Sequence, residues 1–408
     1  MEVFRRLVLT VDEVIDTSPS TFFVAENGAL YACGDNGFGQ LGLGDNEHLS
    51  TLTRVPLDES IAKVVTGNKS TFVLTHNGTL YACGNNYYGQ LGLGDDRDRS
   101  TLTRVPLDES VKTVVVNDNI TYVVTIDGAW YTCGYTDHCP LLPNDTDTRS
   151  ILTRVPVNEA IESVTADGFS VYVVTASGSL YTYGNNRFGQ LGFEGSGNIG
   201  AMTRVPLNEA VKTIVVGRSS TYVLTRSGAL YACGYNEYGQ LGLGDTQNRS
   251  TLTRVPVEER VKTVVSNNAS TFVLAVSGAL YACGLNSSGQ LGLGDSRGRS
   301  TLRRVPLVES VKAVATNNAS MFVLTRSGAL YSCGNNSYGQ LGLGDLEKRL
   351  TPTRVPLAES IKTIAVSDIT AFVRTVDGAL YGCGDNSYGQ LGLGDNSNQN
   401  VFTFLRYC

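Results

Sequence analysis

The hydrophobic and polar positions of this chain repeat with a period of fifty residues. Within one period, three short apolar runs follow one another: Val211–Val216, Ser220–Thr225 and Ala229–Cys233. Short runs rich in β-branched and aromatic residues are typical of buried strands. A fourth run, Met202–Leu207, contains Pro206, which cannot donate a hydrogen bond to a ladder and therefore favours a sheet edge. We expect four strands per repeat and no helix.

A glycine stands between the second and third runs of every period, for example in Ser227-Gly228, Asn77-Gly78 and Asp127-Gly128. Such dipeptides tolerate a positive φ, so they predict a two-residue hairpin with a type I′ turn.

Both faces of the second and third strands are apolar, so each four-stranded unit needs a neighbour on either side. Four strands in ~40–50 residues is the size of a propeller blade. The sequence therefore predicts a single all-β domain, a closed β-propeller of four-stranded antiparallel blades, with an open solenoid as the alternative. The repeats are 1–50, 51–100, 101–150 (degenerate), 151–200, 201–250, 251–300, 301–350 and 351–400, and 401–408 follows as a closing strand.

The chain ends suggest how the ring closes. Residues 401–408 match the opening strand of the other repeats, and residues 2–8 match it more loosely. We expect the two termini to lie side by side, with residues 401–406 pairing in a blade that also contains residues of the first repeat.

The charge balance argues against a nucleic-acid-binding body. Lys and Arg number 32 against 38 Asp and Glu, a net charge of −6, so strong phosphate neutralisation is not expected. The sequence shows no signal peptide, no apolar run long enough for a membrane span and no basic localisation run. We expect an intracellular protein, cytoplasmic or nuclear, that is a monomer.

Seven of the nine cysteines occupy one repeat position. Equivalent positions in neighbouring blades lie ~10 Å apart, whereas bridged Cα atoms lie ~5.5 Å apart. We expect buried, reduced thiols. These cysteines are Cys33, Cys83, Cys133, Cys233, Cys283, Cys333 and Cys383.

Features that resemble catalytic or metal sites have structural explanations. The LGLGD segment is glycine-rich but precedes no helix, so tight turning explains it better than phosphate binding. In the degenerate repeat, Cys133, Asp137, His138 and Cys139 lack zinc-site spacing. We expect no catalytic residues, no cofactor and no metal, and therefore no enzyme.

An arginine and a glutamate also recur at fixed positions, and we expect structural roles for them, such as pairing with one another. The arginines are Arg54, Arg104, Arg154, Arg204, Arg254, Arg304 and Arg354. The glutamates are Glu59, Glu109, Glu159, Glu209, Glu259, Glu309 and Glu359.

The segment Tyr31–Asp45, YACGDNGFGQLGLGD, recurs with small changes in seven of the eight repeats. It resembles the repeats of the regulator of chromosome condensation family, with cysteine where that family often has tryptophan. The single tryptophan and the lack of Gly-Gly pairs argue against WD and kelch blades. The resemblance implies a propeller, usually of seven blades; eight repeats favour eight here, with seven as the alternative.

The resemblance also implies two classes of function. The first is a guanine-nucleotide exchange factor for Ran-like small GTPases. The second is a non-catalytic recognition or scaffold module, as in ubiquitin-ligase and membrane-traffic propellers. The fifty-residue repeats leave no room for the inserted wedge of the family's exchange factor. We expect a protein-interaction propeller that regulates a small GTPase.

Strand direction places the loops after the first and third strands of every repeat on one face. Loops on a rigid scaffold commonly carry binding residues. The candidate partner-binding residues, at positions that vary between repeats, are Lys69, Asp118, Phe169, Arg187, Arg218, Tyr235, Glu237 and Leu285.

Overall fold

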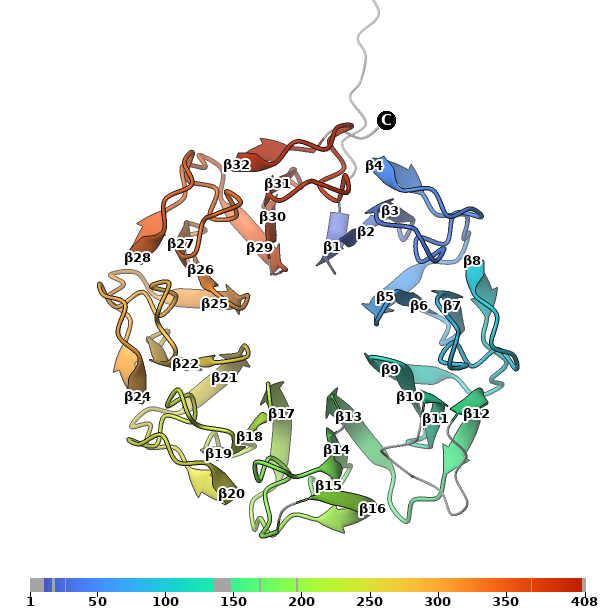
Figure 1. The fold of residues 1–408 in the computed structure, drawn as a ribbon, viewed down its shortest axis with the longest axis horizontal. Coiled ribbons are helices and arrows are strands. Elements are labelled where there is room, and N and C mark those ends of the chain that lie inside the picture. Colours follow the sequence, from blue (N-terminus) through green and yellow to red (C-terminus); the bar gives the residue numbers. More distant parts are fainter. Residues whose placement is uncertain are drawn as a thin grey trace, which may run out of the picture.

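The computed structural model describes residues 11–16, 19–25, 27–135, 148–168, 170–195, 197–367 and 369–405. They form strands β1–β32, and none of them is helical. The strands make eight four-stranded antiparallel sheets, and these blades surround a common centre (Figure 1). The described part of the chain accordingly contains no helix that could cross a membrane. The predicted all-β propeller of eight blades is confirmed.

Each blade takes four consecutive strands, from the centre outward. The inner strands are β1 (Val11–Asp16), β5 (Ile61–Thr66), β9 (Val111–Asn117), β13 (Ile161–Asp167), β17 (Val211–Gly217), β21 (Val261–Ser266), β25 (Val311–Thr316) and β29 (Ile361–Val366). The second strands are β2 (Ser20–Ala25), β6 (Ser70–Thr75), β10 (Ile120–Thr125), β14 (Ser170–Thr175), β18 (Ser220–Thr225), β22 (Ser270–Ala275), β26 (Ser320–Thr325) and β30 (Thr370–Thr375). The third strands are β3 (Leu30–Gly34), β7 (Leu80–Gly84), β11 (Trp130–Tyr135), β15 (Leu180–Asn185), β19 (Leu230–Gly234), β23 (Leu280–Gly284), β27 (Leu330–Gly334) and β31 (Leu380–Gly384). The outer strands are β4 (Leu49–Arg54), β8 (Arg99–Arg104), β12 (Thr148–Val155), β16 (Asn198–Arg204), β20 (Arg249–Arg254), β24 (Arg299–Arg304), β28 (Arg349–Arg354) and β32 (Gln399–Phe404).

The hairpin between the second and third strands differs from the expected type I′ turn. The N–H of Gly228 donates to the C=O of Thr225 at 3.0 Å, and the N–H of Thr225 donates to the C=O of Ala229 at 3.0 Å. Gly228 has a φ of 91°, while Ser227 is not in the positive-φ region. This pattern is that of a longer hairpin loop that ends in a left-handed glycine, so the glycine was predicted correctly and the turn type was wrong.

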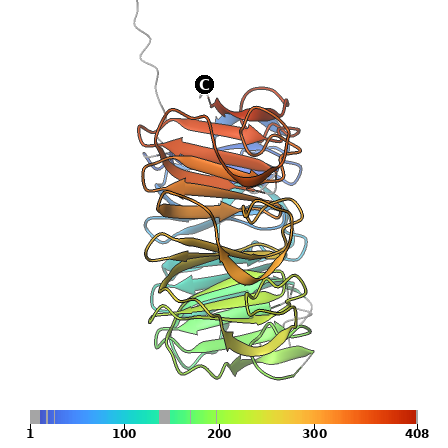
Figure 2. The same cartoon turned by 90° about the vertical axis from the view of Figure 1, so that its left-hand side faces the viewer.

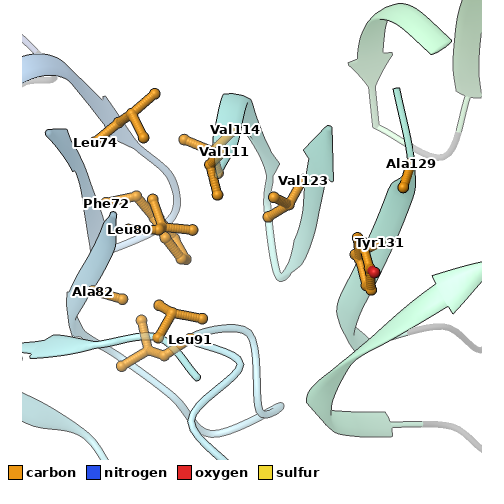
Figure 3. Packing of buried hydrophobic residues seen from close by; sticks show 11 residues of the cluster. Phe72, Leu74, Leu80, Ala82, Leu91, Val111, Val114, Val123, Ala129 and Tyr131 are labelled. Atoms are coloured by element: carbon orange, nitrogen blue, oxygen red, sulfur yellow. The ribbon is translucent and has the colours of Figure 1, made fainter. Parts of the chain in front are cut away.

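The hydrophobic core lies between blades rather than within them. At the junction of the second and third blades, Phe72, Leu80 and Leu91 pack against Val114 and Val123 (Figure 3). Similar buried clusters fill the other junctions. Every blade buries both of its faces in this way, so the apolar side chains on both sides of the second and third strands are removed from water.

The ring closes by ordinary contact between the eighth and first blades. Strand β32 completes the eighth blade, where Phe404 pairs with Tyr381, and no described strand of the first repeat belongs to that sheet. The expected sharing of one blade by residues 401–406 and the first repeat is therefore wrong. The outer strand of each blade instead ends a few residues inside the following repeat. Every blade is therefore made of four strands that are consecutive in the sequence. Residues 2–8 lie outside the described residues.

Candidate functional site

The loops of the blades emerge on two opposite sides of a flat ring (Figure 2). On one side, the loop after the third strand joins the loop after the inner strand: the N–H of Tyr235 donates to the C=O of Ser219 at 2.8 Å. On the other side, the hairpin turn meets the connection between blades, where the N–H of Arg226 donates to the C=O of Ala210 at 2.9 Å. We call the first surface the loop face and the second the turn face.

In seven of the eight blades, the long loop of the loop face is built around a buried asparagine; the third repeat has Thr136 at this position, which lies outside the described residues. The Nδ2 of Asn236 donates to the C=O of Asp245 at 3.1 Å, and its Oδ1 accepts from the N–H of Leu241 at 2.9 Å. Gly239 has a φ of 74°, and a Cβ there would lie 2.5 Å from the Cα of Ser300 in the next blade. The repeated glycines, asparagine and glutamine therefore specify a rigid loop and close blade packing, not a phosphate site.

Aromatic side chains from seven of the eight blades lie on the loop face and form what we call the aromatic belt; the sixth blade, with Ser288 at the recurring position, contributes none. The ring centroid of Tyr88 lies 4.9 Å from that of Tyr87 and 5.1 Å from that of Tyr135 in the next blade. Tyr87 is 71% exposed, so a large apolar surface faces solvent here. The belt consists of Phe38, Tyr87, Tyr88, Tyr135, Phe188, Tyr235, Tyr238, Tyr338 and Tyr388.

Three of the candidate residues meet at the junction of the fourth and fifth blades. The guanidinium of Arg187 lies 5.4 Å from the ring centroid of Phe188, which lies 5.1 Å from that of Tyr235. The hydroxyl of Tyr235 donates to Glu237 at 2.8 Å. Burial, followed by this hydrogen bond, raises the pKa of Tyr235 to about 12, so its hydroxyl stays protonated near neutral pH. An arginine, an aromatic pair and a carboxylate thus form one compact patch.

Two further candidates, Asp118 and Arg218, lie near the inner rim of the loop face. Both are exposed and both act electrostatically on Asp167 of the blade between them. Burial raises the pKa of Asp167, and Asp118 raises it further, whereas the N–H of Ser219 at 3.0 Å and the charge of Arg218 lower it. The rim therefore carries both signs of charge side by side.

The remaining candidates are dispersed. The Nζ of Lys69 lies 4.3 Å from the ring centroid of Phe38, at the junction of the first and second blades. Leu285 is half-buried and does not join the other groups. Phe169 lies outside the described residues. A role in binding stays a prediction for all eight candidates.

Of the aromatic belt, sequence reasoning found only Tyr235. The candidate residues were chosen at positions that vary between repeats, so a recurring aromatic position was left out. Yet Tyr238, Tyr338 and Tyr388, which share one repeat position, are 44%, 43% and 49% exposed. The sequence did contain a signal for the belt: a large aromatic residue recurs in the polar loop that follows the third strand.

The repeated glutamates have a structural role on the turn face. The hydroxyl of Tyr231 donates to Glu209 at 2.7 Å, and that of Ser227 donates to the same carboxylate at 2.5 Å. The Ser227 bond, followed by the Tyr231 bond, holds the pKa of Glu209 below its usual range, and the charge of Arg254 adds to this. The hydrogen-bond partner is thus a tyrosine, not the repeated arginine that we had suggested.

None of the seven repeated cysteines forms a disulfide and all are buried, as predicted. Burial raises the pKa of the Cys133 thiol to about 12, which makes it a poor metal ligand or nucleophile. No group of three or more metal-ligating side chains occurs within the described ranges. Asp137, His138 and Cys139 lie outside those ranges, so the expectation for the degenerate repeat stays a prediction.

The fold and its loops define an eight-bladed β-propeller with a repeated G-x-N-x-x-G-Q-L-G signature. Two family models, both described as regulator of chromosome condensation (RCC1) repeat, match the chain. The first matches residues 27–74, 77–124, 227–274, 327–371 and 377–403, and the second matches 61–90, 211–240 and 311–340. The first model alone matches more than half of the chain, and the protein belongs to this family.

Solved structures share the fold at low sequence identity. Human WBSCR16 is 18% identical with a TM-score of 0.66, over 83% of this chain and 97% of its own. Prp20p from Saccharomyces cerevisiae, studied together with its binding to Gsp1p and histones, is 18% identical with a TM-score of 0.65, over 84% and 90%. Yeast RCC1 (Prp20) bound to Kap60 is 19% identical with a TM-score of 0.63, over 83% and 86%. No significant match was found among curated proteins.

Proposed function

We propose that this propeller binds a protein partner through its loop face and regulates a small GTPase. The observation that carries the proposal is the aromatic belt, in which Tyr87 and Tyr238 are exposed on rigid loops. Tyrosine and arginine are over-represented among residues that dominate binding energy, and exposed aromatic patches mark interaction sites. The patch at Arg187 and Tyr235 supplies both residue types in one place.

The family supports the choice of partner class. Prp20p, a structural neighbour, is described with its binding to Gsp1p and histones, so a propeller of this family can serve protein recognition. We propose that this chain acts by binding alone, without making or breaking covalent bonds. An exchange factor of this kind accelerates nucleotide release because it binds the nucleotide-free GTPase more tightly than the loaded one.

The test is GDP release from Ran-type and related GTPases in the presence of catalytic amounts of the purified chain. We expect acceleration by the wild-type protein. Replacing Tyr87 and Tyr235 by alanine should reduce it at least tenfold, since each hot-spot residue contributes about 1–2 kcal/mol or more.

The matched control replaces Ile126 and Val276, which are 69% and 52% exposed on the turn face, by alanine. This variant should behave like the wild type. Stable co-elution with a GTPase, without acceleration, would favour the non-catalytic recognition module. Equal loss in both variants would show that the loop face has no special role.

A further inference from the structure

A pocket of about 240 Å³ opens on the loop face between the first and second blades. Its walls include Phe22, Asp35, Gly67, Lys69, Ser70 and Thr71, and we call it the junction pocket. Because equivalent junctions recur around the ring, the repeats themselves show what is unusual about this one.

The first unusual group is the hydroxyl of Ser70. At the same repeat position, Ser220 donates to the C=O of Tyr235 at 2.7 Å and Ser270 to that of Leu285 at 2.8 Å. Ser70 is 1% exposed, yet its hydroxyl has no hydrogen-bond partner among the described residues. A Cβ on Gly67 would lie 2.2 Å from Cγ1 of Val116 in the next blade and 3.0 Å from this oxygen, so both groups occupy the space that the glycine leaves.

The second unusual group is the hydroxyl of Thr71. Its counterpart Thr221 donates to the C=O of Gln190 at 2.8 Å and also lies 2.7 Å from the hydroxyl of Tyr172. Phe22 stands in the place of Tyr172, so this second partner is missing at the junction pocket. Thr71 is 1% exposed and has no hydrogen-bond partner within the described part of the chain, as is also true of Thr21 at the closing junction. The junction pocket differs from that junction because Ser70 lacks a partner as well.

Buried hydroxyls without partners are unfavourable, and here two of them line one open pocket. Neither has an acceptor for its proton, so a bound group should bring an acceptor oxygen.

The charged walls restrict the ligand further. The Oδ1 of Asp35 accepts from the N–H of Gly37 at 3.2 Å and lies 3.0 Å from Nδ1 of His48, whereas its Oδ2 accepts from Gln40 Nε2 alone, at 2.8 Å. The second oxygen therefore keeps a lone pair for another donor. Lys69 lies exposed at the opening with its ammonium over Phe38. Asp35 disfavours an anion and Lys69 disfavours a cation, whereas a neutral group that both donates and accepts suits the pocket.

We infer that the junction pocket receives a carboxamide side chain of the protein partner, of the glutamine type. Its carbonyl oxygen would accept from Ser70 and Thr71, its amide N–H groups would donate to Asp35, and its methylenes would pack on Phe22. This inference rests on the proposed function, because it assumes that the loop face binds a protein, and it names one anchoring contact.

The experiment is saturation-transfer difference NMR on the full chain with N-acetylglutamine amide as the probe. N-acetylglutamate amide and N-acetyllysine amide are the charged comparisons. We expect transfer to the glutamine probe at millimolar concentrations and at least fivefold less to the charged probes. The double variant Ser70→Ala with Thr71→Val should lose at least 80% of the signal.

Thr121→Val is the matched control, because Thr121 donates to the C=O of Gln90 at 2.8 Å at the neighbouring junction. It should keep probe binding but lower the melting temperature, whereas the double variant should melt within about a degree of the wild type, since no protein hydrogen bond is lost. If the double variant does not fold, Phe22→Tyr provides the same test: it introduces the hydroxyl that Tyr172 carries and should abolish the signal.

Equal signals from all three probes, or a signal unchanged in the variants, would overturn the inference. The outcome is separable from the GTPase assay. Probe binding without any GTPase effect would leave the pocket standing and refute the proposed partner. A GTPase complex whose formation is indifferent to Phe22→Tyr would refute the pocket.

Discussion

At the scale of single residues, the repeated cysteine shows how the blades approach each other. The thiol of Cys233 donates to the C=O of Gln190 in the preceding blade at 3.4 Å, and that of Cys283 donates to Gln240 at 3.3 Å. A Cβ on Gly42 would lie 3.2 Å from the sulfur of Cys83. The small cysteine side chain therefore fits at a position where the family often has tryptophan. This position holds the thiol in an apolar environment.

Because these thiols are buried, we expect the folded protein to lose stability steeply at alkaline pH. Burial raises the pKa of Cys133 to about 12 and those of its counterparts Cys83 and Cys233 still further. A raised folded-state pKa means that the stabilisation is complete below the unfolded pKa of ~8.5 and is lost as the pH rises above it. Between the unfolded-state and folded-state pKa, each buried thiol lowers the free energy of unfolding by about 1.4 kcal/mol per pH unit.

Urea unfolding between pH 7 and 10 checks this prediction. We expect a flat free energy of unfolding up to about pH 8 and a steep fall above it. Cys233→Ala should be less stable at pH 7, because it leaves a small cavity, but should show a shallower alkaline slope. A slope that is the same in wild type and variant would contradict the thiol explanation.

At the scale of strands and loops, sequence periodicity predicted the elements well because each strand obeys a local rule. The runs at Val211, Ser220 and Leu230 are strands as expected, and Gly228 has the positive φ that its turn needs. The hydrogen-bond partner of Glu209 was not predictable, since it depends on how Tyr231 of a neighbouring strand is placed in three dimensions. Local pattern specifies an element, whereas contacts between elements depend on the packed ring.

The buried asparagine that recurs in seven of the long loops gives a prediction at this scale. Asn236→Ala removes the donor to the C=O of Asp245 and the acceptor for the N–H of Leu241. Because Leu241 is also buried, its N–H would be left unsatisfied, at a cost of about 2–4 kcal/mol in unfolding free energy for the whole change. Urea unfolding measures the loss, and hydrogen exchange should show faster opening of residues 236–248.

Ser287→Ala is the control for this change, because Ser287 is exposed in the equivalent loop of the next blade. It should alter stability by less than about 0.5 kcal/mol. Comparable losses in the two variants would show that the asparagine is not what holds the loop.

At the scale of the whole molecule, the number of repeats correctly predicts eight blades, because each repeat can bury its faces only against neighbours. The mode of closure was not predictable from the same pattern. Residues 401–408 resemble every opening strand, so the sequence alone cannot tell whether they begin a shared blade or finish the last one. The exposed faces are equally hard to predict, since the roles of the recurring Tyr238 position and of Gly67 depend on what the next blade places beside them.

The closing junction is built like the internal ones. Phe23 and Phe372 pack with ring centroids 5.7 Å apart, and the thiol of Cys33 donates to the C=O of Gln390 at 3.4 Å. Leu391 and Leu405 are fully buried in the same cluster, which joins the first and eighth blades. Closure therefore depends on side-chain packing between blades and not on a strand shared by the two ends.

This gives a prediction with an internal reference. Leu391 at the closing junction and Leu291 at an internal junction share one repeat position, and both are 0% exposed. In a closed ring, Leu391→Ala and Leu291→Ala should each lower the free energy of unfolding by about 2–5 kcal/mol, and the two losses should agree within about 1 kcal/mol.

Deleting residues 401–408 should lower the melting temperature of the whole ring, because Leu405 and most of β32 are lost. If Leu391→Ala were nearly neutral while Leu291→Ala destabilised, or if the deletion left the melting temperature unchanged, the two end blades would not be joined in solution and an open solenoid would describe the protein better.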